Sequence, residues 1–272
     1  MWVILFAFLL IVIILLWIFY LQPWVGHKIY IRERCQTAAY LHYPEISFER
    51  SDERKERQKF LFILDANIYF SNCPNLGPIP IPEGFTARKI TSSVGGYNDM
   101  YGYVFENSDT VIISFTGTYH YYQWALDLET NLVPMNDSKD IKVHQGFDSI
   151  FRGMEDQINN LNIGNKKLYI SGISLGGALS LLTALQLHKY NPSVYAFASP
   201  RVFNIAGAKL IDKMVPNIIR ICNTEDMIPT LPLASGEQQN YMHVGKCENF
   251  TMNLGSPIKN HTDAYAQHYL NS

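Results

Sequence analysis

The distribution of apolar and polar residues divides the chain into two parts. Residues 1–21 read MWVILFAFLLIVIILLWIFYL and contain no charged side chain. As a helix that rises about 1.5 Å per residue, this run would span roughly 30 Å, the thickness of the hydrocarbon core of a bilayer. After it, short apolar stretches alternate with stretches of helical spacing. The pattern therefore predicts an N-terminal transmembrane helix followed by a globular region.

A cleaved signal peptide is the alternative for 1–21. No basic residue precedes the apolar run, and no A-x-A-like cleavage site follows it closely. The run is also longer than the apolar region of a signal peptide, which usually has about 7–15 residues. These features favour an uncleaved, single-pass anchor.

The orientation of this anchor stays open. Lys28, Arg32 and Arg34 follow the apolar run and no Lys or Arg precedes it, which favours a cytosolic globular domain. Glycosylation sequons favour the opposite side of the membrane. They are NDS at Asn136, NFT at Asn249 and NHT at Asn260.

The region after the anchor divides into a linker and one domain. Residues 22–57 are mostly polar and enter the charge run FERSDERKERQKF, so we predict a juxtamembrane linker there. No linker rich in Pro and Gly interrupts 84–272, which favours a single domain over 58–272. Within it, the periodicity predicts helices over 58–70, 144–161 and 175–190, and strands over 101–106, 110–115, 166–173, 193–200 and 217–223.

The order of these elements indicates the fold class. Near-continuous apolar strands that alternate with helices are typical of a mostly parallel α/β sheet with flanking helices. The composition, 47% hydrophobic and 17% charged, provides enough apolar residues for a substantial core. The net charge is −2 and no basic stripe occurs, so we predict no nucleic-acid partner.

The cysteines leave two possibilities open. No metal-ligand spacing occurs among the four cysteines, which are Cys35, Cys73, Cys222 and Cys247. They either form up to two disulfides or remain buried thiols. No cluster of His, Asp and Glu has ligand spacing either. We therefore predict neither a metal nor a cofactor.

One serine lies among glycines between a predicted strand and a predicted helix. Residues 172–176 read GISLG and match G-x-S-x-G, the pattern of a nucleophile elbow in this setting. The small flanking residues let the strand and the helix pass close together, and the helix N-terminus favours negative charge beside Ser174. An ordinary strand-to-helix turn with a surface serine is the alternative.

A serine nucleophile requires an orienting carboxylate and a base, which in this fold class follow it in that order. Asp226 follows the predicted strand 217–223 and would lie at the sheet edge where sites of open α/β sheets form. Glu225 is its neighbour and rival.

The candidate base comes from the histidines after the elbow. His261 lies in a polar loop before a final short helix, a suitable position for a base. His188 lies roughly 20 Å along the predicted helix and is too distant. His243 and His268 remain as alternatives.

Together these residues resemble the fungal-type (class 3) lipases, a branch of the α/β-hydrolases. The matching segments follow one another in order between Thr110 and Tyr265. They are VIISFTGT at 111–118, YQWALDL at 122–128, VHQGF at 143–147, ISGISLGGALSLL at 170–182, NTEDMIPTLP at 223–232, YMHVG at 241–245 and HTDAY at 261–265.

The resemblance implies an α/β-hydrolase fold and assigns the roles. It implies Ser174 as nucleophile, Asp226 rather than Glu225 as orienting acid, and His261 as base. For the oxyanion hole it points to Thr118 and to the backbone N–H of Leu175. It also implies that His243 and His144 are structural.

In this family the segment that resembles VIISFTGT (111–118) is a strand followed by the oxyanion loop, and a short lid comes after that loop. The resemblance therefore implies that YHYYQW at 119–124 forms this lid, and the alternative is that these rings pack in place. The candidate lid residues are Tyr119, His120, Tyr121, Tyr122 and Trp124.

The resemblance implies a serine ester hydrolase that acts on acylglycerols at a membrane or lipid-droplet interface. The alternatives are a phospholipase A1 or lysophospholipase with the same triad, and a catalytically silent module that binds lipid or protein. The presence of all three triad residues argues against the silent module. Nothing in the sequence of the lid or pocket separates the two enzyme classes.

Overall fold

The computed structural model describes residues 33–46, 53–94, 97–119, 131–135, 138–232 and 240–271. The predicted transmembrane helix over 1–21 lies outside these residues. Among the residues described, no helix is long and apolar enough to cross a membrane.

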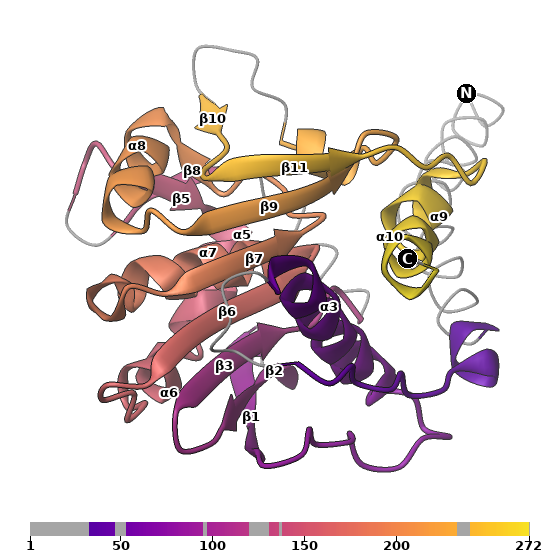
Figure 1. Cartoon of the computed structure of the whole chain (residues 1–272). Helices are drawn as coiled ribbons and strands as arrows, with labels where there is room; N and C mark the ends of the chain where they lie inside the picture. Colours follow the sequence, from indigo (N-terminus) through magenta and orange to yellow (C-terminus); the bar gives the residue numbers. More distant parts are fainter. Residues whose placement is uncertain are drawn as a thin grey trace, which may run out of the picture.

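A seven-stranded sheet forms the centre of the molecule, in the order β1-β2-β3-β6-β7-β9-β11 (Figure 1). The strands β1, β2 and β3 pair antiparallel, and all pairs from β3 to β11 are parallel. The predicted sheet, mostly parallel and flanked by helices, is therefore confirmed. The strands are β1 (Thr86–Val94), β2 (Tyr97–Glu106), β3 (Thr110–Phe115), β6 (Lys167–Ile173), β7 (Ser193–Phe197), β9 (Ile218–Asn223) and β11 (Lys246–Phe250).

The sequence predicted the inner strands and missed the two edge strands. Every residue of β3 is buried, because helices cover both faces of the sheet, and this burial explains the continuous apolar run. The strands β1 and β11 lie at the edges and carry mostly polar or partly exposed side chains. Their sequences therefore lack the apolar pattern on which the prediction depended.

Helices cover the sheet on both sides (Figure 1). One core cluster joins α3 (Arg54–Phe70) to one face, and a second joins α5 (Gln145–Arg152) and α7 (Leu175–Gln186) to the other. The helices α9 (Pro257–His261) and α10 (Asp263–Leu270) lie beyond the carboxyl ends of β9 and β11 in Figure 1.

The first helix starts before the predicted domain boundary at residue 58. Helix α3 begins at Arg54, within the charge run, and Arg57 is buried with its guanidinium 5.7 Å from the centre of the Tyr169 ring. Arg54 forms an ion pair with Glu248 at 2.6 Å. These contacts place the end of the charge run on the domain rather than in a linker.

The predicted helix over 144–161 is two helices, α5 and α6 (Glu155–Asn159). The break includes Gly153, where an added Cβ would lie 2.1 Å from Ser92 Oγ. The close approach of β1 therefore interrupts a segment whose periodicity is helical throughout.

A second, four-stranded sheet lies beside the main one, in the order β10-β8-β5-β4, and its pairs are antiparallel. Its strands and the remaining helices are β4 (Leu132–Pro134), β5 (Lys142–His144), β8 (Phe203–Asn204), β10 (Tyr241–Met242), α8 (Ile205–Met214) and the 3-10 turns His188–Tyr190 and Ile228–Thr230.

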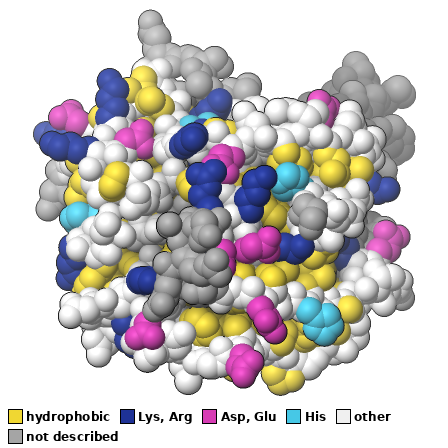
Figure 2. Space-filling view, viewed as in Figure 1, with side chains coloured by type: hydrophobic (Ala, Val, Ile, Leu, Met, Phe, Trp, Pro, Cys, Tyr) yellow, Lys and Arg dark blue, Asp and Glu magenta, His cyan; other side chains and the backbone are white. Residues whose placement is uncertain are grey.

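The structure decides between the two possibilities for the cysteines. Cys35 and Cys73 form a disulfide, whereas Cys222 and Cys247 are free thiols. On the face seen in Figure 2, basic and acidic side chains are interspersed among apolar ones, without a continuous basic stripe over the described residues of that face.

Candidate active site

Ser174 lies at a sharp turn between β6 and α7. Its φ of 57° and ψ of −120° are unusual for a residue with a side chain. The Ser174 N–H donates to the Phe197 carbonyl at 2.8 Å, which holds the turn against the neighbouring strand β7. At Gly172, an added Cβ would lie 2.1 Å from the Gly176 carbonyl oxygen, so only glycine allows the helix to start this close to the strand.

A hydrogen-bonded chain connects Ser174 to a histidine and an aspartate. His261 Nε2 lies 2.8 Å from Ser174 Oγ, and His261 Nδ1 lies 2.8 Å from Asp226 Oδ2. When Nδ1 carries the ring proton and donates it to the carboxylate, Nε2 is free to accept the serine proton. The structure thus brings together the three residues that the sequence predicted for the triad.

Buried donors hold the Asp226 carboxylate in place. The Ile228 N–H donates to Oδ1 at 2.9 Å, and the Tyr265 hydroxyl donates to Oδ2 at 3.0 Å. Burial raises the pKa of Tyr265, so its hydroxyl remains a donor. Tyr265 was not predicted from the sequence as a site residue, although its position in the HTDAY segment with His261 was a usable signal.

Glu225, the rival acid, points elsewhere. Its carboxylate accepts a hydrogen bond from Asn253 Nδ2 at 2.9 Å. Asn223 connects the acid loop to the base loop, because its side-chain amide donates to the carbonyls of Met252 and Asn260 at 2.8 and 3.0 Å. This buried asparagine was not found from the sequence either.

The other histidines have structural contacts. His243 Nε2 donates to the Pro229 carbonyl at 2.6 Å, and burial together with the positive charge of Arg220 lowers the pKa of His243 to about 4. His268 stacks on Phe250 at 4.2 Å between ring centres.

His144 and His188 are also held within their own segments. The ring of His144 caps α5 by accepting from the Phe147 N–H at 3.4 Å. His188 begins the 3-10 turn after α7, and its Nδ1 lies 2.8 Å from the Leu185 carbonyl.

The loop after β3 packs against the elbow. At Gly117 an added Cβ would lie 3.6 Å from Ser174 Cβ, and at Gly176 it would lie 2.4 Å from the Phe115 carbonyl. Thr118 directly follows Gly117, and Leu175 is the first residue of α7. Both residues predicted for the oxyanion hole therefore lie on segments that meet at the elbow.

A buried carboxyl group connects the two strands that carry these segments. Asp65 of α3 accepts hydrogen bonds from Ser114 Oγ at 2.5 Å and Ser171 Oγ at 2.8 Å. The two serines are paired across β3 and β6. Burial raises the pKa of Asp65 well above its usual value, and the two hydroxyl donors oppose this effect.

Of the predicted lid residues, the structure describes Tyr119, which is partly buried. His120, Tyr121, Tyr122 and Trp124 lie outside the described residues. Among the described residues, no group of three or more His, Cys, Asp and Glu side chains could hold a metal ion.

A mostly parallel sheet with helices on both faces and a serine elbow defines an α/β-hydrolase. Within this class, the sequence model of the family described as Lipase (class 3) matches residues 112–236. This matched segment, which carries the serine elbow and the acid loop, belongs to the class 3 lipase family.

Several known proteins are similar to this chain. The secreted mono- and diacylglycerol lipase A of Penicillium camembertii is 31% identical over 184 residues, which cover 64% of this chain and 57% of that relative. The chloroplastic phospholipase A1-Igamma3 of Arabidopsis thaliana is 22% identical over 201 residues, which cover 57% of this chain and 38% of that relative. The match thus covers only about half of the length of these curated relatives or less.

The similarity extends to solved structures. A structure of the triacylglyceride lipase of Rhizomucor miehei superposes with a TM-score of 0.58 at 26% identity, covering 76% of this chain and 83% of that chain. The mono- and diacylglycerol lipase of Aspergillus oryzae superposes with a TM-score of 0.57 at 22% identity, covering 75% and 82%, and supports the fold.

Proposed function

We propose that the protein is a serine ester hydrolase that acts on acylglycerols. The observation that carries this proposal is the chain of hydrogen bonds from Ser174 Oγ through the His261 ring to the buried Asp226 carboxylate. Such a chain activates a hydroxyl that is otherwise a weak nucleophile.

The reaction follows from this geometry. Ser174 Oγ attacks the ester carbonyl while His261 Nε2 takes its proton, and Asp226 stabilises the imidazolium. The N–H groups of Leu175 and Thr118 hold the negative charge of the tetrahedral oxygen. His261 then gives the proton to the leaving alcohol, and the acyl group remains on Ser174. Water, deprotonated by His261, releases the fatty acid and restores the serine.

The choice of acylglycerols is supported by the names of the fungal relatives. A lipase acting on mono- and diacylglycerols and one acting on triacylglycerides resemble this chain at 31% and 26% identity. Phospholipase A1 activity is the second candidate, because the Arabidopsis thaliana relative of that name matches over 201 residues. A catalytically silent module would not need the hydrogen-bonded triad.

We further propose that 1–21 anchors the enzyme in a membrane and that the catalytic domain lies on the extracytoplasmic side. The Cys35–Cys73 disulfide supports this orientation, because disulfides persist in oxidising compartments and are rare in the cytosol. The sequence favoured the cytosolic side through three basic residues, but Arg34 forms an ion pair with Asp263. The positive charge of Arg34 is therefore paired within the catalytic domain, which weakens its use as a signal of orientation.

The test uses the full-length protein in detergent. On p-nitrophenyl esters of several chain lengths, Ser174→Ala is expected to lower kcat by roughly four orders of magnitude or more, with fluorophosphonate labelling lost. Equal rates of ester hydrolysis for Ser174→Ala and the original protein would contradict the proposal that the protein is an enzyme. A panel of triacylglycerol, monoacylglycerol and phosphatidylcholine then separates the two substrate classes.

A further inference from the structure

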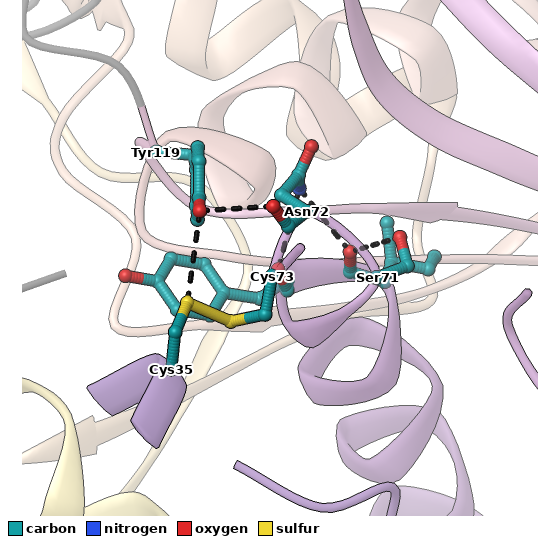
Figure 3. Close-up of a disulfide and its surroundings, with 7 residues drawn as sticks. Cys35, Ser71, Asn72, Cys73 and Tyr119 are labelled. Atoms are coloured by element: carbon teal, nitrogen blue, oxygen red, sulfur yellow. Dashed lines mark hydrogen bonds between the residues drawn. A yellow bond between two sulfur atoms is a disulfide. The ribbon is translucent and has the colours of Figure 1, made fainter. Parts of the chain in front are cut away.

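The Cys35–Cys73 disulfide lies directly beside the oxyanion loop (Figure 3). It joins the short helical segment 33–37 to the turn that follows α3. The Tyr119 hydroxyl donates to the Asn72 carbonyl at 2.9 Å and lies 3.7 Å from Cys35 Sγ. The Tyr119 ring also packs edge-on against the Tyr69 ring of α3, with 5.5 Å between ring centres. The disulfide and this tyrosine thus meet at the same turn after α3.

Tyr119 attaches the oxyanion loop to the turn that follows α3. It directly follows Thr118, and the loop between β3 and Tyr119 has no regular secondary structure. At its other end, the Thr116 N–H donates to the Tyr101 carbonyl at 2.9 Å. The hydroxyl of Tyr119 fixes the far end to Asn72. Since Thr118 lies between these two attachments, movement of either one would displace its N–H.

The same segment also touches the side of the site that carries the base. Arg34 forms an ion pair with Asp263, the first residue of α10. Asp263 follows His261 by two positions in the chain. The neighbouring residues Arg34 and Cys35 therefore connect the histidine side of the site to the oxyanion side.

We propose that the Cys35–Cys73 disulfide and the Tyr119 hydroxyl form a positioning element that holds the Thr118 N–H in the oxyanion hole. This inference rests on the proposed function of Ser174. It makes Tyr119 a fixed attachment of the oxyanion loop instead of a moving part of a lid. An oxyanion donor acts chiefly in the transition state, so its displacement lowers kcat and leaves substrate binding unchanged.

The experiment compares variants of the full-length protein. Tyr119→Phe removes the hydroxyl and keeps the ring, and a second variant combines Cys35→Ser with Cys73→Ser. The matched control is Tyr40→Phe, because the Tyr40 hydroxyl donates at 2.6 Å to the Gly77 carbonyl in the stretch just after the disulfide. For each protein, kcat, KM, the fluorophosphonate labelling rate and the thermal unfolding midpoint are measured.

Tyr119→Phe is expected to lower kcat roughly tenfold at unchanged KM, a fraction of the roughly 100- to 1,000-fold cost of losing one oxyanion donor. Labelling of Ser174 slows by a similar factor, because phosphonylation also develops charge in the hole. Tyr40→Phe is expected to change neither kcat nor the labelling rate of Ser174. Adding Tyr119→Phe to the disulfide variant is expected to lower kcat by a smaller factor than in the original protein, because the disulfide holds the turn that carries the Asn72 acceptor.

The outcomes separate this inference from the proposed function. A normal kcat and labelling rate in Tyr119→Phe, with Ser174→Ala inactive, overturns the positioning role alone. A lower unfolding midpoint with unchanged kcat does the same, because it shows a purely structural role. Full activity in Ser174→Ala overturns the proposed function and this inference with it. If the disulfide variant fails to fold, Tyr119→Phe still decides.

Discussion

At the scale of single residues, the buried carboxyl of Asp65 shows how much of the site depends on side chains outside it. Its two serine partners lie 49 and 106 residues away in the sequence. One precedes the oxyanion loop on β3, and the other precedes the elbow on β6. The Asp65 carboxyl therefore connects α3 to both of the strands that carry the two halves of the site.

Asp65 also makes the stability of the protein depend on pH. Its folded-state pKa is raised by burial, whereas the unfolded value is about 3.9. Between these two values the unfolded state binds fewer protons, so stability falls as the pH rises through this window. Asp65→Asn, which stays neutral and retains an acceptor oxygen, is expected to raise the urea unfolding midpoint at pH 8 and to change it little at pH 4.

The control for this prediction is Asp140→Asn, an exposed carboxyl in a turn. It should leave the midpoint unchanged at both pH values. If Asp65→Asn and the original protein unfold at the same urea concentration at pH 8, the assignment of Asp65 as a costly buried acid is wrong.

At the scale of elements, the contact between β6 and α7 makes the elbow possible. The sequence predicted this strand, turn and helix in order, because the apolar periodicity changes from that of a strand to that of a helix at the glycine-rich stretch 172–177. Of the neighbours Glu225 and Asp226, only Asp226 contacts His261, as the resemblance of the NTEDMIPTLP segment implied.

Gly172→Ala is expected to damage this contact severely. The new Cβ would meet the Gly176 carbonyl oxygen, a backbone atom that cannot move without displacing the helix. We expect a loss of roughly 3 kcal/mol or more in the free energy of unfolding, measured by urea denaturation. Gly77→Ala, where an added Cβ meets no atom within 4 Å, is the matched control. Similar unfolding curves for the two variants would contradict the proposed crowding.

At the scale of the whole molecule, the orientation across the membrane can be tested through the sequons. Asn249 is exposed on the edge strand β11. Asn260 is 7% exposed, and its amide is occupied, because Nδ2 donates to the Glu225 carbonyl at 3.1 Å and Oδ1 accepts from the Leu254 N–H at 2.7 Å. A glycan on Asn260 would break these contacts beside the catalytic histidine.

In eukaryotic cells the full-length protein is therefore expected to carry a glycan on Asn249 and none on Asn260. Endoglycosidase treatment should increase its mobility on a gel, and Asn249→Gln should reduce that shift by one glycan. Asn260→Gln should leave the shift unchanged. Absence of any glycan would place the catalytic domain on the cytosolic side and overturn the proposed orientation.

The sequence by itself determined the mostly parallel sheet, the elbow and the order of the triad residues. These features are encoded locally, by a periodic run, a cluster of small residues or a motif, and local signals can be read along one stretch of chain. The tertiary structure alone decided the pairing of Cys35 with Cys73, the contact of Asp65 with its two serines and the attachment of Tyr119. Each of these joins residues dozens of positions apart, and only the packing of α3 on the sheet brings them together.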